Sequence, residues 1–418
     1  MKTPEDIFRY QNGNLVAEEV NLKETFKESL TPLFVYSGRQ MEENVRFLKD
    51  NLSELPVEIF YSMKANYTPK IVKQMHSLGV GIEVVSGGEL YIALKSGVPA
   101  KDIIYAGNGK RVDELLYSQE VGIKALNVDS IPELNLIAKL KLKLPIGLRI
   151  NPEVDPKTHP KIATGLKNTK FGIHFDLIDE ALEIIKDKKL NFAGLHFHLG
   201  SQIFDPGVYD EALENLYAHI DKFREFDLKF IDIGGGLGVN YERWKGNEIY
   251  FDIETFRKII EKWIDRYQKA FKNVRFYIEP GRFLVANAGI LITRVLYKKK
   301  TPHRNFLVVD AGFNDFGRPS MYEAYHHIEA LELSSQKINA DVVGPICESG
   351  DFLGKDREIS DVDEGELLAL FDAGAYGRSM SSFYNGRVLA QQYMINGDRV
   401  DLISRRGTVE QIIANEIL

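Results

Sequence analysis

A regular alternation of strand-like and helix-like segments runs through most of this 418-residue chain and constrains its fold more than any other feature. Short runs rich in β-branched and aromatic residues alternate with longer amphipathic segments over about 240 residues, which is typical of a (β/α)8 TIM barrel. A doubly wound sheet is the alternative, but it usually carries a glycine-rich first turn, whereas the glycine-rich turn here follows the seventh strand. The predicted strands are Val57–Tyr61, Gly81–Val85, Asp102–Tyr105, Lys124–Val128, Pro145–Ile150, Phe192–His198, Phe230–Ile233 and Val274–Ile278.

Beyond Gly281 the pattern changes to short apolar runs separated by turn residues, which predicts a second, mostly β domain. We expect an N-terminal segment, 1–35, that packs with the β domain, then a barrel over 36–285 and a β sandwich or barrel over 286–418. The polar segment 151–172 follows the fifth predicted strand, on the face that carries active sites in barrels. A mobile lid and a surface excursion without function are both open alternatives for it.

Charge and composition exclude several classes of protein. The formal net charge is -7 and the pI about 5.8, so the basic surface that nucleic acids require is missing. No apolar run approaches the ~20 residues that span a bilayer, and the N-terminus lacks an apolar secretory core. The single cysteine, Cys347, excludes an internal disulfide and fits a reducing compartment. We therefore expect a cytoplasmic protein that binds neither nucleic acid nor membrane.

Reactive side chains stand at the ends of several predicted strands, where a barrel gathers its active site. Lys64 follows the first strand, and a lysine there is either a solvated charge or an amine that forms a Schiff base. The glycine turn 234–238 follows strand seven, where barrels bind phosphate, although tight chain reversal also explains it. It matches neither a dinucleotide nor a Walker motif, so a small phosphate ester is expected rather than a nucleotide. Glu279 ends strand eight, where a carboxylate can hold a proton on a heterocyclic nitrogen.

Two histidines, His196 and His198, end the sixth predicted strand and share one face of it. A metal-dependent barrel hydrolase would use such a pair, but the sequence offers no convincing further ligands, so no metal is expected. In the other interpretation His198 lies flat against a bound ring, and His196 is a core histidine whose hydrogen bonds are satisfied. A lysine, a phosphate turn, a stacking histidine and a carboxylate at a ring nitrogen together fit one cofactor, pyridoxal 5′-phosphate.

The motifs of this chain resemble those of the alanine-racemase-like (fold type III) enzymes and, among them, of the diaminopimelate decarboxylases, over nearly the whole chain. The barrel motifs, which mark the broader decarboxylase group, are Tyr61-Ser62-Met63-Lys64-Ala65-Asn66, Ser86-Gly87-Gly88-Glu89, 196–202, 234–238 and 279–282. In the second domain the motifs are Arg318-Pro319-Ser320-Met321-Tyr322, Cys347-Glu348-Ser349-Gly350-Asp351 and Gly374-Ala375-Tyr376. The first of these three narrows the resemblance to the diaminopimelate decarboxylases.

The resemblance implies conversion of meso-2,6-diaminopimelate to L-lysine and carbon dioxide, the last step of lysine biosynthesis, with pyridoxal phosphate as cofactor. It implies that Lys64 binds the cofactor as a Schiff base, that His198 stacks on its ring and that Glu279 pairs with the ring nitrogen. The other cofactor-binding residues that it implies are Ser201, Gly235, Gly236, Gly281, Arg282 and Tyr376. For the distal end of the substrate it implies Arg282, Arg318, Tyr322 and Glu348, and it implies Tyr376 as a further substrate-binding residue.

The resemblance also implies a homodimer with shared active sites. Cys347 would give a proton to the reacting carbon, and Cys347 and Glu348 would reach into the partner's site. A thiol with an ordinary pKa near ~8.5 can give and recover a proton near neutrality. The alternative for a lone cysteine is an inert buried thiol, and the polar, turn-rich surroundings over 344–351 count against it.

The nearest alternative function keeps the fold and cofactor but acts on another basic amino acid or on carboxynorspermidine. Arginines bind carboxylates bidentately, so Arg318 argues against substrates that lack a distal carboxylate. A regulatory relative without activity should have lost Lys64, Glu279 or Cys347, and this chain keeps all three. One departure from the family pattern is Glu83, where relatives often carry aspartate, and it puts only an indirect contact in doubt.

Overall fold

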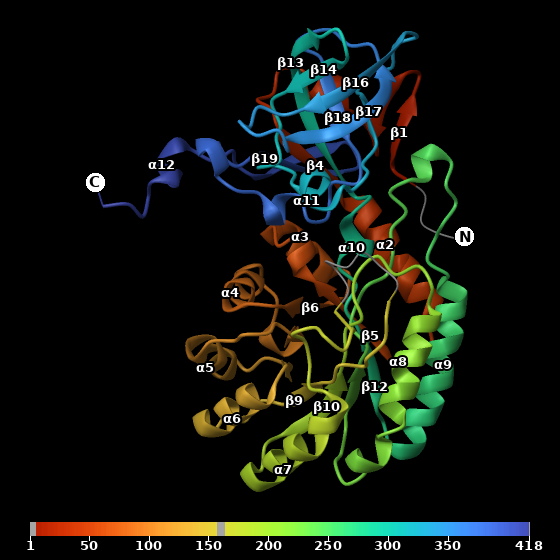
Figure 1. Ribbon diagram of the computed structural model, residues 1–418, viewed down its shortest axis with the longest axis vertical. Helices are drawn as coiled ribbons and strands as arrows, with labels where there is room; N and C mark the ends of the chain where they lie inside the picture. Colours follow the sequence, from red (N-terminus) through yellow and green to blue (C-terminus); the bar gives the residue numbers. More distant parts are fainter. Residues whose placement is uncertain (1–5, 157–163, 418) are drawn as a thin grey trace. The chain divides into compact units, whose positions relative to one another are not determined.

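The computed structural model describes residues 6–156 and 164–417, which fall into two compact units (Figure 1). The barrel unit contains Val45–Val239 and Ile249–Phe283. The β unit contains the preceding N-terminal residues up to Asn44, the segment Asn240–Glu248, and the chain from Leu284 onward. The expected domain boundaries at residues 35 and 285 stay a prediction. The segment 151–172, for which a mobile lid and a surface excursion without function are both open, lies partly outside the described residues.

The barrel unit is a closed barrel of eight parallel strands, which confirms the predicted TIM barrel. Each strand lies within two residues of its predicted bounds, because β-branched and aromatic runs buried on both faces are a strong strand signal. The strands are β5 (Val57–Ser62), β6 (Gly81–Val84), β7 (Ile103–Tyr105), β8 (Ala125–Val128), β9 (Ile146–Arg149), β10 (Phe192–His196), β11 (Phe230–Asp232) and β12 (Arg275–Ile278).

Helices alternate with the barrel strands along the chain and lie around them (Figure 1). Several begin at a side chain that caps the first turn: Ser86 accepts a hydrogen bond from the Glu89 backbone N–H, and Asp252 accepts one from that of Thr255. Among the helices described, none combines the length and the apolar character that crossing a bilayer requires. They are α2 (Gly38–Asn51), α3 (Pro69–Ser77), α4 (Gly87–Lys95), α5 (Val112–Val121), α6 (Ile131–Leu140), α7 (Ile178–Lys188), α8 (Gly207–Tyr217), α9 (Ile253–Ala270) and α10 (Arg282–Val285).

Aromatic rings fill part of the barrel interior. The rings of Phe230 and Tyr277 stack with centroids 4.8 Å apart, and the ring of Phe60 lies 4.8 Å from that of Tyr277. A Cβ atom at Gly194 would come within 2.5 Å of the Phe230 ring, and one at Gly81 within 2.5 Å of the Phe60 ring. These strands therefore carry glycine where the rings need space, and the interior is packed rather than open.

The β unit is built on a nine-stranded sheet, which confirms the prediction of a mostly β second part. Its strand β4 (Leu33–Ser37) precedes the barrel in sequence, but pairs with β13 and β19 of this sheet. The other strands are β13 (Gly289–Lys300), β14 (Asn305–Val309), β15 (Ile328–Ala330), β16 (Lys337–Val343), β17 (Phe352–Ser360), β18 (Leu367–Leu370), β19 (Gln391–Asn396) and β20 (Arg399–Ser404).

Smaller elements complete the β unit. The N-terminal residues form a three-stranded sheet that the sequence analysis did not predict, because its strands are only two to four residues long. These elements are β1 (Phe8–Gln11), β2 (Asn14–Ala17), β3 (Val20–Asn21), α1 (Leu22–Phe26), α11 (Arg318–Tyr322) and α12 (Val409–Ile412).

A partly buried histidine of the β unit should make stability depend on pH. His327 precedes β15 and stacks on Trp244 with ring centroids 4.6 Å apart. Burial lowers the pKa of His327 to about 4, and Arg243 and Arg357 act in the same direction, while Glu329 opposes them. An unfolded histidine has a pKa near ~6.5, so the unfolded chain gains a proton first as the pH falls. The stabilisation is therefore complete above pH ~6.5 and is lost progressively down to pH ~4.

We expect the free energy of unfolding of the wild type to fall by about 2 kcal/mol more than that of His327→Leu between pH 7.5 and pH 5. Urea denaturation of both proteins at several pH values measures this difference. The other titrating groups are common to both proteins, so their contribution cancels. Identical pH profiles would contradict the neutral state of the partly buried His327.

Candidate active site

Lys64 lies in the single turn Met63–Ala65 that follows β5, at the carboxyl end of the barrel. Two buried acids surround it, Glu83 on β6 and Glu279 after β12. Burial raises the pKa of both carboxyl groups, and the positive charge of Lys64 opposes that rise in each case. The Ser62 hydroxyl donates a short hydrogen bond to Glu83, which anchors this acid beside the lysine.

Glu279 forms a carboxyl pair with Asp232 at the end of β11. Burial raises the pKa of Asp232 well above its usual range, and the charge of Glu279 raises it further. Asp232 also accepts hydrogen bonds from the Asn127 amide (3.1 Å) and from the Gly234 backbone N–H (3.0 Å). Asp232 therefore carries the shared proton, and Glu279 keeps its negative charge.

His196 is buried on β10 as expected, but the expectation that its hydrogen bonds are satisfied is wrong. Within the part of the chain that the structure describes, neither ring nitrogen has a hydrogen-bond partner, and Nε2 lies 3.5 Å from Glu279 Oε2. Burial lowers the pKa of His196 well below its usual value, so the ring is neutral. His196, Asp232 and Glu279 place their ligand atoms within 4.8 Å of one another, a spacing that a metal ion could also use.

His198 lies beside the glycine turn, and the structure brings the two together as predicted for a cofactor site. Its Nδ1 accepts a hydrogen bond from the Gly235 backbone N–H (3.1 Å), so that nitrogen carries no proton. Burial lowers the pKa of His198 well below its usual value, and the charges of Lys64 and Arg149 lower it further. The imidazole is therefore a neutral ring held in one orientation.

The glycine turn is a cradle of bare backbone. A Cβ atom at Gly235 would lie 2.1 Å from the Glu279 carbonyl oxygen, and one at Gly236 would lie 2.6 Å from the Gly200 carbonyl oxygen. Gly236 also has a φ of 118°, which L side chains rarely adopt. The Tyr209 hydroxyl donates to the Gly235 carbonyl oxygen (2.9 Å) and fixes the turn from behind. Only glycine fits these positions, and a glycine turn of this kind lets an anion approach the backbone closely.

Arg282 and Ser201 meet near the start of the short helix α10. The Arg282 guanidinium donates from Nε (3.2 Å) and Nη2 (3.0 Å) to the Ser201 hydroxyl oxygen. Gly281 packs against β5, where a Cβ atom would lie 2.9 Å from the Ser62 carbonyl oxygen. Ser201, Gly281 and Arg282 thus lie on one unit with Lys64 and Glu279, as predicted.

Apart from Arg282, the residues predicted to bind the substrate belong to the β unit. Arg318 begins α11 and is only 6% exposed. Tyr322 ends α11 and is half-buried. Tyr376 follows β18 and has a φ of 57°, in the left-handed region, so its backbone turns sharply there. Each of these side chains therefore lies at a helix end or a turn, where loops position binding groups.

Cys347 and Glu348 lie on an exposed loop, so the alternative of an inert buried thiol is wrong. Asp351 anchors the loop by accepting hydrogen bonds from the backbone N–H groups of Ile346 (2.6 Å) and Phe313 (2.7 Å). The Tyr384 hydroxyl donates a short hydrogen bond to Glu348. The loop backbone is therefore fixed while the thiol and the carboxylate face outward.

Known proteins are similar to this chain in sequence and in fold. Residues 39–286 match the family model described as "Pyridoxal-dependent decarboxylase, pyridoxal binding domain". The diaminopimelate decarboxylase of Aquifex aeolicus is 41% identical over 414 residues, covering 97% of this chain and 96% of the relative. The crystal structure of diaminopimelate decarboxylase from M. jannaschii in complex with L-lysine is 36% identical and covers 100% of this chain and 98% of its own, with a TM-score of 0.91. The chain belongs to the diaminopimelate decarboxylase family of pyridoxal-dependent decarboxylases.

The barrel residues of this diaminopimelate decarboxylase family member fit pyridoxal phosphate. Glu279 Oε1 is buried and has no hydrogen-bond partner among residues 6–156 and 164–417, so it can accept from a protonated ring nitrogen. The glycine cradle and the Arg282 guanidinium supply donors of the kind that a phosphate needs. The residues of the site therefore include groups suited to the ring nitrogen, the ring face and the phosphate of the cofactor.

The sequence analysis did not identify two residues of the candidate site of this decarboxylase, Asp232 and Asn127. Asp232 ends β11 two residues before the glycine turn, so its strand-end position was a signal that could have found it. Asn127 lies within the buried strand β8, so its sequence context indicates a core residue. Asn127 and Asp232 are 105 residues apart in the sequence, and only the closed barrel brings their side chains together. No local pattern predicts such a pairing.

Proposed function

We propose that this chain is a pyridoxal-phosphate-dependent carboxy-lyase that converts meso-2,6-diaminopimelate to L-lysine and carbon dioxide. Membership in the diaminopimelate decarboxylase family over nearly the whole chain supports this function. The structural observation that carries it is the unpartnered oxygen of the buried Glu279 carboxylate, beside Lys64, among the described residues. Solved relatives from M. jannaschii and Helicobacter pylori hold L-lysine, the product of this reaction.

The chain's own residues would prepare the cofactor for this chemistry. When bound, pyridoxal phosphate supplies an electron sink for the pair that is left when carbon dioxide departs. Lys64 would hold the cofactor through its amine, and His198 would offer a neutral flat ring to its face. Glu279 would hold the proton at the ring nitrogen, because its charge is kept while Asp232 carries the proton of the pair. The remaining proposed cofactor contacts come from Ser201, Gly235, Gly236, Gly281, Arg282 and Tyr376.

Residues of the β unit, together with Arg282 of the barrel unit, would bind the substrate and complete the reaction. A distal amino-acid head has a carboxylate and an ammonium, which call for guanidinium donors and a carboxylate respectively. We assign the carboxylate to Arg282, Arg318 and Tyr322 and the ammonium to Glu348, and we propose Tyr376 as a further substrate contact. Cys347 would give the proton that the reacting carbon needs after carbon dioxide leaves.

Carbon dioxide release from the purified holoenzyme tests the function directly. We expect release from meso-diaminopimelate and little from L-lysine, L-ornithine or L-arginine, which lack a second carboxylate at the distal end. Release from ornithine, arginine or carboxynorspermidine alone would support the alternative substrate class and overturn the assignment of Arg318 and Tyr322. No release from any of them would overturn the proposed activity.

Replacing Glu279 tests its role at the ring nitrogen. Glu279→Gln keeps the shape of the side chain but removes the negative charge, so kcat should fall by about 10²-fold. The protein should also bind the cofactor more weakly, and equilibrium dialysis measures this affinity without any substrate. Glu120→Gln, at an exposed position of α5, is the matched control and should leave both quantities unchanged. Full activity of Glu279→Gln would contradict the role.

A homodimer with shared active sites is also part of the proposal. The exposed thiol of Cys347 and carboxylate of Glu348 support it, because both lie outward on a fixed loop. Large apolar side chains are exposed as well, including Phe383 (37%), Tyr384 (44%) and Met321 (50%). Sedimentation equilibrium should give about twice the chain mass of 47.5 kDa, and a monomer would contradict the proposal. A cytoplasmic location is proposed too, supported by the single cysteine.

A further inference from the structure

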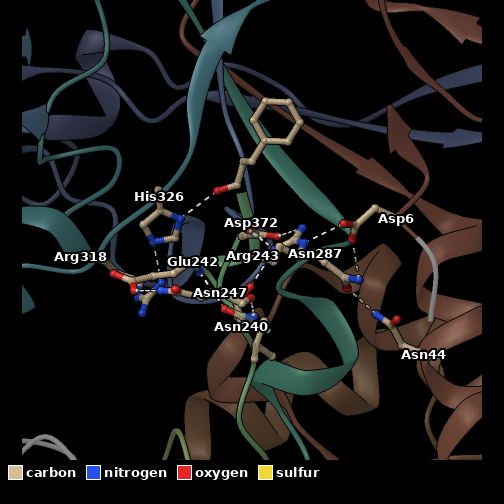
Figure 2. A network of polar contacts seen from close by, with 12 residues as sticks. Asp6, Asn44, Asn240, Glu242, Arg243, Asn247, Asn287, Arg318, His326 and Asp372 are labelled. Atoms are coloured by element: carbon tan, nitrogen blue, oxygen red, sulfur yellow. Dashed lines mark hydrogen bonds and ion pairs between the residues drawn. The ribbon is translucent and has the colours of Figure 1, made fainter. Parts of the chain in front are cut away.

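Arg318 is held by two neighbours on different sides of its guanidinium. Its Nη1 lies 2.6 Å from Nε2 of His326 (Figure 2). Its central carbon lies 4.4 Å from the ring centroid of Tyr241. His326 follows α11 and precedes β15, whereas Tyr241 comes from the segment Asn240–Glu248. One neighbour supplies a directional acceptor and the other an aromatic face, so the plane of the guanidinium is fixed.

The hydrogen bonds of His326 determine its protonation. Nδ1 lies 2.8 Å from the Phe371 carbonyl oxygen, which can only accept, so Nδ1 carries the proton. A guanidinium can only donate, so Nε2 is bare and accepts from Arg318. The ring is fully buried, and the rings of Phe316 and Tyr241 meet it edge-on at 4.7 and 4.9 Å. His326 is therefore a rigid, neutral acceptor aimed at Arg318.

The segment that carries Tyr241 is anchored by a buried ion pair. Arg243 binds Asp372 through two hydrogen bonds of 2.8 and 2.9 Å, and it binds Asp6 through a third of 2.7 Å (Figure 2). Burial alone would lower the pKa of Arg243, but the two carboxylates raise it above its usual value, so the charge is retained. Arg243 also donates to the Asn240 carbonyl oxygen (3.0 Å), which ties the backbone next to Tyr241.

We propose that His326 and Tyr241 are positioning residues that orient Arg318 for the distal carboxylate of the substrate, and so set specificity. This inference rests on the proposed function, because it takes Arg318 as a ligand of that carboxylate. An arginine side chain loses rotamer entropy when it is ordered, and fixing it beforehand removes that loss from substrate binding. Without His326 the guanidinium loses this directional acceptor, and substrate binding must restore part of the lost order.

Two small amines separate this role from a general loss of the site. L-lysine, the product, keeps the distal amino-acid head, whereas cadaverine is the same chain without any carboxylate. We expect His326→Leu to weaken L-lysine binding to the holoenzyme by about 10- to 100-fold, because a buried guanidinium loses its acceptor. Cadaverine binding should stay within about twofold. Titration of the cofactor's visible absorbance with each amine measures both affinities without turnover.

Matched variants test whether a substitution disturbs folding and whether the loss of an aromatic ring alone changes binding. His326→Gln places an amide oxygen toward Arg318 and an amide N–H toward the Phe371 carbonyl, so L-lysine binding should stay within about threefold of wild type. Tyr241→Leu removes the aromatic face and should weaken L-lysine by about fivefold. His327→Leu replaces the adjacent histidine, which stacks on Trp244, and should leave both affinities unchanged. In steady-state assays, KM for diaminopimelate should rise in His326→Leu with kcat unchanged.

The outcomes distinguish this inference from the proposed function. If the wild type releases no carbon dioxide from diaminopimelate, or binds L-lysine no better than cadaverine, the proposed function fails and the inference fails with it. If the wild type discriminates and His326→Leu discriminates equally well, the positioning role is overturned while the function stands. An equal loss of both amines in His326→Leu, with rescue absent in His326→Gln, would also overturn the role, because it would reveal a structural effect.

Discussion

A Lys64→Ala variant should lose decarboxylation of diaminopimelate by at least about 10⁴-fold, because it removes the amine that would hold the cofactor. The position of this lysine supports so large an effect. It follows β5 at the carboxyl end of the barrel, and its charge acts on Glu83, Glu279 and His198, which would surround the cofactor. The alternative of a solvated loop lysine would predict almost no change.

A covalent label provides a second measurement that does not depend on activity. Borohydride reduction of the wild-type holoenzyme should fix the cofactor to the peptide that contains Lys64, and mass spectrometry should locate it there. The Lys64→Ala variant should carry no label. Lys70→Ala, at an exposed lysine of α3, is the control and should retain activity and labelling. Labelling of another lysine in the wild type would contradict the assignment.

The sequence predicted the barrel well because its strands are buried on both faces and leave strong local patterns. The β unit was harder. Strand β17 (Phe352–Ser360) contains Lys355, Asp356, Arg357 and Glu358. Because these four residues are charged, a search for apolar runs does not predict a strand there. The segment Asn240–Glu248 lies between β11 and α9 in sequence but belongs to the β unit, because Arg243 pairs with Asp372. Such a long-range ion pair leaves no local signal.

In the candidate site, too, some residues can be predicted from the sequence and others cannot. Strand ends locate Lys64 and Glu279, since a barrel presents its chemistry there. The proton of the carboxyl pair depends instead on the burial of Asp232 and on its distance from Glu279, which only the folded barrel sets. His326 shows the same limit, because its role follows from two hydrogen bonds to Arg318 and to the Phe371 carbonyl rather than from any spacing.

Cys347→Ala should lower kcat by about 10²- to 10³-fold, because the carbanion left after carbon dioxide departs would lose its positioned proton donor. The fixed loop makes this expectation specific: Asp351 holds the backbone, so the thiol has a defined place. Binding of L-lysine should change little, because the thiol is assigned to the reacting carbon and not to the distal head. Ser349→Ala, exposed on the same loop, is the control and should keep full activity. Unchanged kcat in Cys347→Ala would exclude the thiol as the donor.

Mixing two inactive variants tests whether the thiol acts in the partner's site. In a heterodimer of Lys64→Ala and Cys347→Ala chains, one site would lack both groups and the other would contain both. Random assortment makes half of the dimers mixed, so coexpression should restore about a quarter of the wild-type activity. If each site used the lysine and the thiol of one chain, every site in the mixture would lack one group and no activity would return. Recovery therefore requires both dimerisation and a shared site, which the outward-facing Cys347 loop favours.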